Sequence, residues 1–119
     1  MSDSMHRTVR YDLSKMPNCL DHESRKILGF TIRTTDGEDE NYASKRAEAK
    51  DTGMTEELIR FSLVSYELEE GKQEIKHPFE AFDRWSTKAR NFVVAAWKKL
   101  ATPDEKEIAD FFASATDVE

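Results

Sequence analysis

The sequence has few of the cysteine and histidine residues that stabilise small proteins through disulfides or metal sites. Its one cysteine, Cys19, cannot form an internal disulfide, and an intracellular reducing compartment is therefore expected. Cys19 and His22 have the spacing of half a metal site, but a structural zinc needs four ligands and no second Cys/His pair occurs. We interpret Cys19 as a partly exposed loop thiol. The four glycines are scattered, which excludes a glycine-rich phosphate loop, and no metal or cofactor is expected.

Long apolar runs are also absent. The longest, Phe92 to Trp97, falls far short of the ~20 residues that a membrane-spanning helix needs. No positively charged start followed by an apolar run marks a secretory signal. These features predict a cytoplasmic protein with no membrane contact.

Basic residues are outnumbered, with 18 Lys and Arg against 24 Asp and Glu and a net charge of −6. This charge disfavours nucleic-acid binding. The acidic residues lie in runs that repel one another, whereas catalytic carboxylates need a cleft that separates their pKa values, so we expect no catalytic residues. The charge is segregated, at +3 over residues 79–101 and −5 over residues 102–119, a polarity that would allow homo-oligomers to form head to tail.

Apolar residues alternate in two early segments, which predicts two half-buried strands. The first segment contains Val9, Tyr11 and Leu13, and the second contains Leu28, Phe30 and Ile32. The intervening residues 16–24 are expected to form a loop because Pro17 and Asn18 interrupt the pattern.

The sequence pattern in the middle of the chain predicts two helices followed by a β-hairpin. Turn chemistry at Asp36-Gly37 precedes a surface helix over residues 38–50, which Gly53 should end. A second helix should open near Thr55 and run to about Ser62, followed by a strand to Leu68; a helical reading of residues 58–68 stays open. Glu70-Gly71 then reads as a hairpin turn, with residues 72–76 as the returning strand.

The C-terminal third has the clearest helical signals. Pro78 can open a short helix, and Ser86 can cap a longer one through its hydroxyl. The segment Thr102-Pro103-Asp104-Glu105 has the pattern of a capping box and starts a last helix. Apolar residues recur at helical spacing in three stripes, and we expect most of their rings to be buried, with Trp85 or Trp97 left exposed as an anchor and the third stripe buried. The stripes are Phe79, Phe82 and Trp85; Phe92, Val93, Ala96, Trp97 and Leu100; and Ile108, Phe111, Phe112 and Ala115.

Together these elements predict one helix-rich α+β domain over residues 6–116, with loose ends at 1–5 and 117–119. A small β-sheet or hairpins would pack with a C-terminal helical hairpin. We expect the domain to act by binding another protein. Our candidate partner-binding residues are Trp85, Lys88, Arg90, Trp97 and Tyr42, because an indole favours a half-wet anchoring position and residues 38–50 carry few apolar side chains.

The stretch from Leu58 to Ala113 resembles small phage proteins of the tail-assembly-chaperone kind. The resemblance lies in an acidic segment over residues 36–50, an apolar segment over 63–71, Pro78-Phe79, Trp85-x2-Lys88-x-Arg90-x-Phe92 and Leu100-x2-Pro103. Members of this family are α-rich binders thought to keep the hydrophobic tape-measure protein soluble until the tail tube forms around it. The resemblance therefore implies a tail protein as partner. It does not extend to the loop of Cys19 and His22.

Two other functions stay open. An acidic regulatory inhibitor could bind a host protein or mimic nucleic acid, as the net charge suggests. An enzyme would require distant carboxylates or Cys19 to converge in one pocket.

Overall fold

The computed structural model describes residues 7–69, 74–76 and 79–114, and it has the predicted α+β fold. Four antiparallel strands form one sheet in the order β1-β2-β3-β4, so neighbours in the sheet are also neighbours in strand number. The strands are β1 (Thr8–Asp12), β2 (Ile27–Arg33), β3 (Leu63–Leu68) and β4 (Glu74–Lys76).

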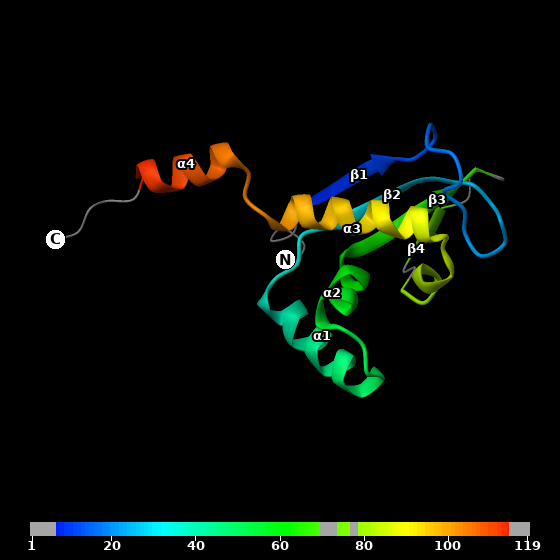
Figure 1. Cartoon of the computed structure of the whole chain (residues 1–119), viewed down its shortest axis with the longest axis horizontal. Coiled ribbons are helices and arrows are strands. Elements are labelled where there is room, and N and C mark those ends of the chain that lie inside the picture. The colour runs from blue at the N-terminus through cyan, green and yellow to red at the C-terminus, as the bar shows by residue number, and fades with distance from the viewer. Residues whose placement is uncertain (1–6, 70–73, 77–78, 115–119) are drawn as a thin grey trace.

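The helices surround this sheet unevenly (Figure 1). Two of them are inserted between β2 and β3 and lie beyond one end of the sheet, whereas α3 lies across one face and α4 extends away from the body. The helical elements are α1 (Gly37–Lys50), α2 (Met54–Ser62), the 3₁₀ turn η3 (Ala81–Arg84), α3 (Thr87–Ala101) and α4 (Glu105–Ser114).

Helix α1 begins as the turn chemistry predicts but ends differently. The Asp39 amide donates to Asp36 Oδ1 at 2.9 Å, and the Asp36 amide donates to Asp39 Oδ2 at 3.0 Å, which completes a capping box. Asp51, not Gly53, ends the helix: it adopts the left-handed conformation with φ of 57°, which an aspartate tolerates better than most residues. Gly53 instead precedes α2 as its N-cap.

The change from α2 to β3 falls between Ser62 and Leu63, as predicted. The open choice over residues 58–68 thus resolves into a helix followed by a strand. In β2, Phe30 and Ile32 are buried as expected, but Ile27 is buried in place of Leu28. A register shift in the β2–β3 ladder between Ile27 and Gly29 breaks the strict alternation there.

The core lies between the sheet and α3. Trp85 is at its centre with 4% of its surface exposed, and its ring packs edge-on against Tyr66, with the ring centroids 4.7 Å apart. The prediction that Trp85 could serve as an exposed anchor is therefore wrong; its aromatic neighbours make the site fully apolar. The most deeply buried core side chains include Phe30, Phe82, Ile27, Ile32, Leu68 and Val93.

A buried carboxylate joins the two inserted helices. Glu57 is 1% exposed, accepts from Arg46 Nε at 2.7 Å and accepts from Thr52 Oγ1 at 2.8 Å. Arg60, buried beside it, pairs with Asp83 of η3. Buried charges need such partners because desolvation alone would expel them, so this network fixes α1 and α2 against the rest of the domain.

The two predicted C-terminal helices are present. Ser86 caps α3 as expected, its hydroxyl accepting from the Ala89 amide at 3.3 Å. The second cap is displaced from the predicted position: Asp104 and Glu107 bond each other's backbone amides, at 2.7 and 3.0 Å, so α4 starts at Glu105.

The prediction that α4 buries its apolar stripe is wrong. Ile108, Phe111 and Phe112 are 43%, 65% and 68% exposed, because α4 projects from the body and makes the molecule 60 Å long in a 36 × 29 Å cross-section. Several predictions fall outside the described residues: the Glu70-Gly71 turn, the role of Pro78, the burial of Ala115, and the loose ends at 1–5 and 117–119.

Candidate protein-binding site

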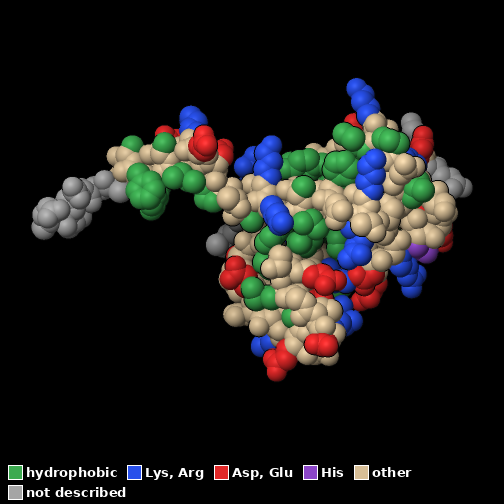
Figure 2. Space-filling model, viewed as in Figure 1, with side chains coloured by type: hydrophobic (Ala, Val, Ile, Leu, Met, Phe, Trp, Pro, Cys, Tyr) green, Lys and Arg blue, Asp and Glu red, His purple; other side chains and the backbone are tan. Residues whose placement is uncertain are grey.

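The two most exposed large apolar side chains among the described residues, Phe111 and Phe112, lie on one side of α4. Phe111 and Phe112 contact each other with ring centroids 5.2 Å apart. With Ile108, Pro103 and Glu107 they line a shallow, mostly apolar concavity of about 600 Å³. Figure 2 shows hydrophobic side chains gathered along one side of this helix. We call the apolar residues of this concavity, Pro103 just before the helix and Ile108, Phe111 and Phe112 on it, the α4 apolar face. Grouped exposed apolar residues of this kind typically mark an interaction surface.

Charged residues flank and face away from the apolar stripe of α4. Glu105 and Glu107 lie in the first turn beside the stripe, where they favour the positive end of the helix dipole. On the side away from the stripe, Lys106 pairs with Asp110 at 3.6 Å. The cap and these pairs stabilise the helix without any burial. A capped helix with an exposed apolar stripe and no buried residues presents a ready surface for an amphipathic partner.

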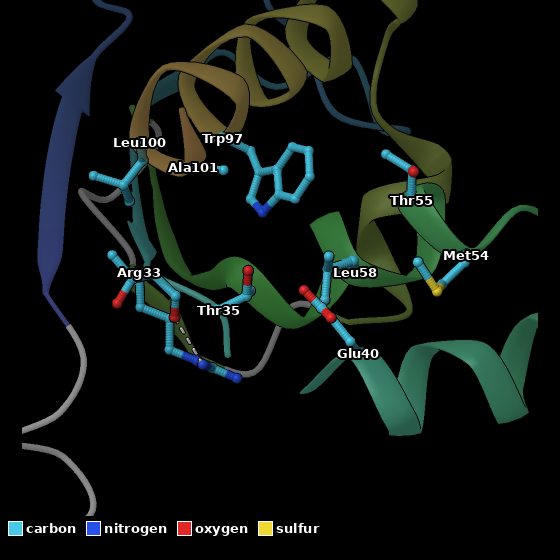
Figure 3. A pocket seen from close by; sticks show the side chains of 10 residues that line it. Arg33, Thr35, Glu40, Met54, Thr55, Leu58, Trp97, Leu100 and Ala101 are labelled. Atoms are coloured by element: carbon cyan, nitrogen blue, oxygen red, sulfur yellow. Dashed lines mark hydrogen bonds between the residues drawn. The ribbon is translucent and has the colours of Figure 1, made fainter. Parts of the chain in front are cut away.

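A second hollow lies at the C-terminal end of α3, between that helix, α2 and the start of α1. Its volume is about 390 Å³. Figure 3 shows the Trp97 ring pointing from α3 toward Leu58 of α2, with Glu40 of α1 at the far wall. We call this hollow the Trp97 groove. Its lining residues are Arg33, Thr34, Thr35, Glu40, Met54, Thr55, Leu58, Trp97, Leu100 and Ala101.

The floor and the rim of the Trp97 groove differ in chemistry. Leu58, Trp97 and Leu100 make an apolar floor, whereas Thr35 and Thr55 are polar. The Nε1 atom of Trp97 is buried and has no hydrogen-bond partner within the described chain. An indole N–H normally finds an acceptor when it is buried; Nε1 of Trp85 in the core also has no partner within the described residues, so both indoles are held by apolar packing.

The five candidate partner-binding residues do not form one patch. Trp97 lines the groove, but Trp85 is in the core. Lys88 is exposed near the start of α3, about 13 Å along the helix axis from Trp97, and Arg90 lies over the Phe82 ring at 5.1 Å. Tyr42 is 55% exposed on α1.

The loop that carries Cys19 serves the fold. The Cys19 side chain is 0% exposed, so the prediction of a partly exposed thiol is wrong; the backbone bond from the Ile27 amide to the Cys19 carbonyl, at 2.9 Å, holds the loop against β2. His22 stays outside this contact and faces Glu23 at 3.5 Å. Across residues 7–69, 74–76 and 79–114, no group of three or more His, Cys, Asp or Glu side chains is placed to hold a metal ion.

None of the described helices has the length and apolar character needed to cross a membrane. Comparisons with protein-family models, with curated proteins and with solved structures find no match. The candidate site is therefore argued from the geometry of this chain alone.

Sequence reasoning identified the α4 stripe but assigned it to the core. A stripe at helical spacing has the same pattern whether it covers its own domain or a partner. Pro103 is the residue that could have indicated an exposed stripe, because a proline separates the last helix from the one that covers the sheet.

Proposed function

We propose that this chain is a protein-binding factor that holds an apolar polypeptide segment against the α4 apolar face, and that it acts as a phage tail-assembly chaperone in the host cytoplasm. The observation that carries this proposal is the exposure of Phe111 and Phe112 on a capped, projecting helix. Exposing two phenylalanines to water is unfavourable by about 1.5–3 kcal/mol for each side chain relative to full burial. A partner segment that covers them would recover part of that free energy.

The tail-protein assignment is supported by the resemblance of the stretch from Leu58 to Ala113, which contains α4. A tape-measure protein is long, apolar and helical, and an apolar helix can lie along another helix through contacts at i, i+3 and i+4. The charged residues of α4 that face away from the stripe, Lys106 and Asp110, would stay in water, and the net charge of −6 would keep the complex dispersed.

The alternative, an acidic inhibitor that mimics nucleic acid, has less support. Such mimicry needs a row of unpaired carboxylates, whereas many acidic side chains of the body are paired with arginines. Examples are Arg10–Glu67, Arg25–Asp21, Arg33–Asp39, Arg46–Glu57 and Arg60–Asp83.

The test is co-expression of the chain with the tape-measure protein of the same phage, followed by measurement of how much of that protein stays in the supernatant. We expect the wild-type chain to raise this fraction and to co-purify with it. The variant F111S/F112S should lose both effects, whereas Met16→Ser, at an exposed apolar position in the loop before β2, should retain them. Equal holding by F111S/F112S would contradict the role of α4, and no holding by the wild type would contradict the chaperone function.

A further inference from the structure

Strand β1 lies at one edge of the described sheet and pairs there only with β2 (Figure 1). At its two ends the Leu13 amide donates to the Leu28 carbonyl at 2.7 Å, and the Thr34 amide donates to the Arg7 carbonyl at 2.9 Å. Such bonded pairs recur at every second residue of an antiparallel ladder. The residues between them therefore point their amides and carbonyls away from β2, and these residues are Thr8, Arg10 and Asp12.

This edge has few of the features that keep an edge strand from pairing with another chain, which are shortness, proline, bulges and charges. Strand β4 at the other edge has only three residues, whereas β1 has five, contains no proline and pairs with β2 without a register shift. Its two charges are bonded within the chain. Arg10 reaches across Gly29 to Glu67 of β3, with Nε 2.7 Å from Oε1. Asp12 Oδ1 accepts from the Ser14 amide at 2.9 Å.

A strand added at this edge must match β1 on both faces of the sheet. Val9 and Tyr11 face the side of α3, where they line a hollow of about 410 Å³ next to Leu100, and the residues between them are exposed on the other face. The added strand therefore needs apolar side chains on the first face and polar ones on the second. Strand β1 has this alternation itself.

We propose that β1 of a second copy pairs antiparallel with β1, which joins the two sheets in a symmetric dimer. One register pairs all five residues of the strand: with Arg10 at the symmetry axis, Thr8 faces Asp12 of the second copy and both strands exchange their outward backbone hydrogen bonds. Val9 then faces Tyr11 of the second copy, a favourable cross-strand pair of a β-branched and an aromatic residue. This inference goes beyond the proposed function, since it concerns the chain without any client.

Charge does not oppose this register. Two Arg10 side chains face each other at the axis, and like charges in that position are unfavourable. Each guanidinium is paired with Glu67 of its own copy, however, so the axis carries two neutral pairs. The dimer should depend on backbone hydrogen bonds and apolar contact, and it should change little between about 0.05 and about 0.5 M salt. The interface is small, so a weak, concentration-dependent dimer is expected.

The test removes the outward amide at the centre of the strand. Arg10→Pro loses an N–H that β2 does not use, at an edge position where proline is tolerated. Arg10→Ala is the matched control, because it loses the same ion pair with Glu67 and keeps the amide. In sedimentation velocity at increasing concentration, the wild type and Arg10→Ala should dimerise, whereas the association constant of Arg10→Pro should be lower by about tenfold or more. Circular dichroism checks that both variants are folded.

A second measurement tests the register without a proline. Thr8→Cys and Asp12→Cys change exposed positions, and the native Cys19 is buried. Under mild oxidation an equimolar mixture of these two variants should form a disulfide-linked dimer, because the facing Cα atoms would be about 5.5 Å apart, within disulfide range. Each variant alone should form none, since its cysteines would lie on opposite sides of the axis.

Four results would overturn the proposal. They are a wild type that stays monomeric at all concentrations, a dimer that Arg10→Pro retains at full strength, a dimer lost in F111S/F112S, which would indicate α4–α4 pairing, and a dimer lost in high salt, which would indicate pairing through charged faces. Arg10→Pro should still hold the client, so failure of this inference is distinguishable from failure of the proposed function.

Discussion

Gly29 lies in the middle of β2, where the side chain of Arg10 crosses the strand to reach Glu67 at 2.6 Å. A Cβ at Gly29 would lie 2.7 Å from the Tyr11 carbonyl oxygen and 2.5 Å from Arg10 Nη2. The arginine could move, but the backbone oxygen of the paired strand could not. We expect Gly29→Ala to lower the free energy of unfolding by about 1–3 kcal/mol, measured by urea denaturation.

Gly37 provides the matched control for that substitution. A Cβ there meets nothing within 4 Å, and alanine favours a helix more than glycine does. Gly37→Ala should therefore leave stability unchanged or slightly raised. Equal loss in both variants would show that the close approach at Gly29 is unimportant.

The ion pair between Arg33 and Asp39 should make stability depend on pH. Hydrogen bonds from Arg33, at 2.9 and 3.0 Å, lower the pKa of Asp39 below its ordinary value of 3.8. A carboxyl whose pKa is lower in the folded state stabilises the fold above its unfolded pKa and loses that contribution as the pH falls through the folded pKa.

We therefore expect the difference in unfolding free energy between the wild type and Asp39→Asn to shrink as the pH is lowered from about 6 to about 3. Urea denaturation at several pH values measures this difference. A difference that stays constant with pH would mean that Asp39 contributes no linked protonation.

Among the helices, α1 is attached in part through the buried carboxylate of Glu57. Removing it would take the acceptor from Thr52 Oγ1 and leave Arg46 with its longer contact to Glu80, at 3.6 Å, and with the Phe79 ring. Breaking a buried pair costs about 3–5 kcal/mol. Since Arg46 is partly exposed, we expect Glu57→Ala to cost on the order of 3 kcal/mol. Glu48→Ala, at an exposed position of α1, should cost little. Thermal unfolding followed by circular dichroism compares the two.

Helix α4 should contribute almost nothing to the stability of the body. None of its residues is buried. We therefore expect F111S/F112S to change the free energy of unfolding, measured by urea denaturation, by no more than about 0.5 kcal/mol. Phe82→Ala, at a core position that is 2% exposed, should cost about 3–5 kcal/mol. A large loss of stability in the α4 variant would show that α4 packs on the domain in solution.

Which elements the sequence predicts depends on whether their signals are local. Ser62 and Leu63 mark the change of period from helix to strand, and Ser86 carries its own cap; both were predicted in place. Asp51 was missed because a glycine two residues later is the commoner helix terminator. The first helix of the C-terminal third was predicted from Phe82 and Trp85, whose spacing also fits the observed 3₁₀ turn.

The shape of the whole molecule should be measurable in solution. Its radius of gyration is 16.6 Å, whereas a compact domain of this length has about 13–14 Å. Small-angle X-ray scattering, extrapolated to low concentration, should give the larger value for the full chain. A chain ending at Ala101 should approach the compact value, and an unchanged value would mean that α4 is folded against the body.

At this scale the sequence predicted the α+β class but not the candidate site. The Trp97 groove is made by residues of β2, α1, α2 and α3 that are far apart in the chain, such as Thr35, Leu58 and Trp97. Periodicity identifies a face of each helix and says nothing of how those faces meet. The sequence also did not predict the direction of α4, because that direction depends on the backbone angles of Thr102.

The insertion of α1 and α2 between β2 and β3 has a consequence for the folding rate. The central ladder closes only when residues 34–62 have been brought together, and closing so long a loop carries an entropic barrier. Early formation of the helical pair would shorten the effective loop. Glu57→Ala should then slow refolding and leave the unfolding rate nearly unchanged, the kinetic signature of a contact already formed in the transition state.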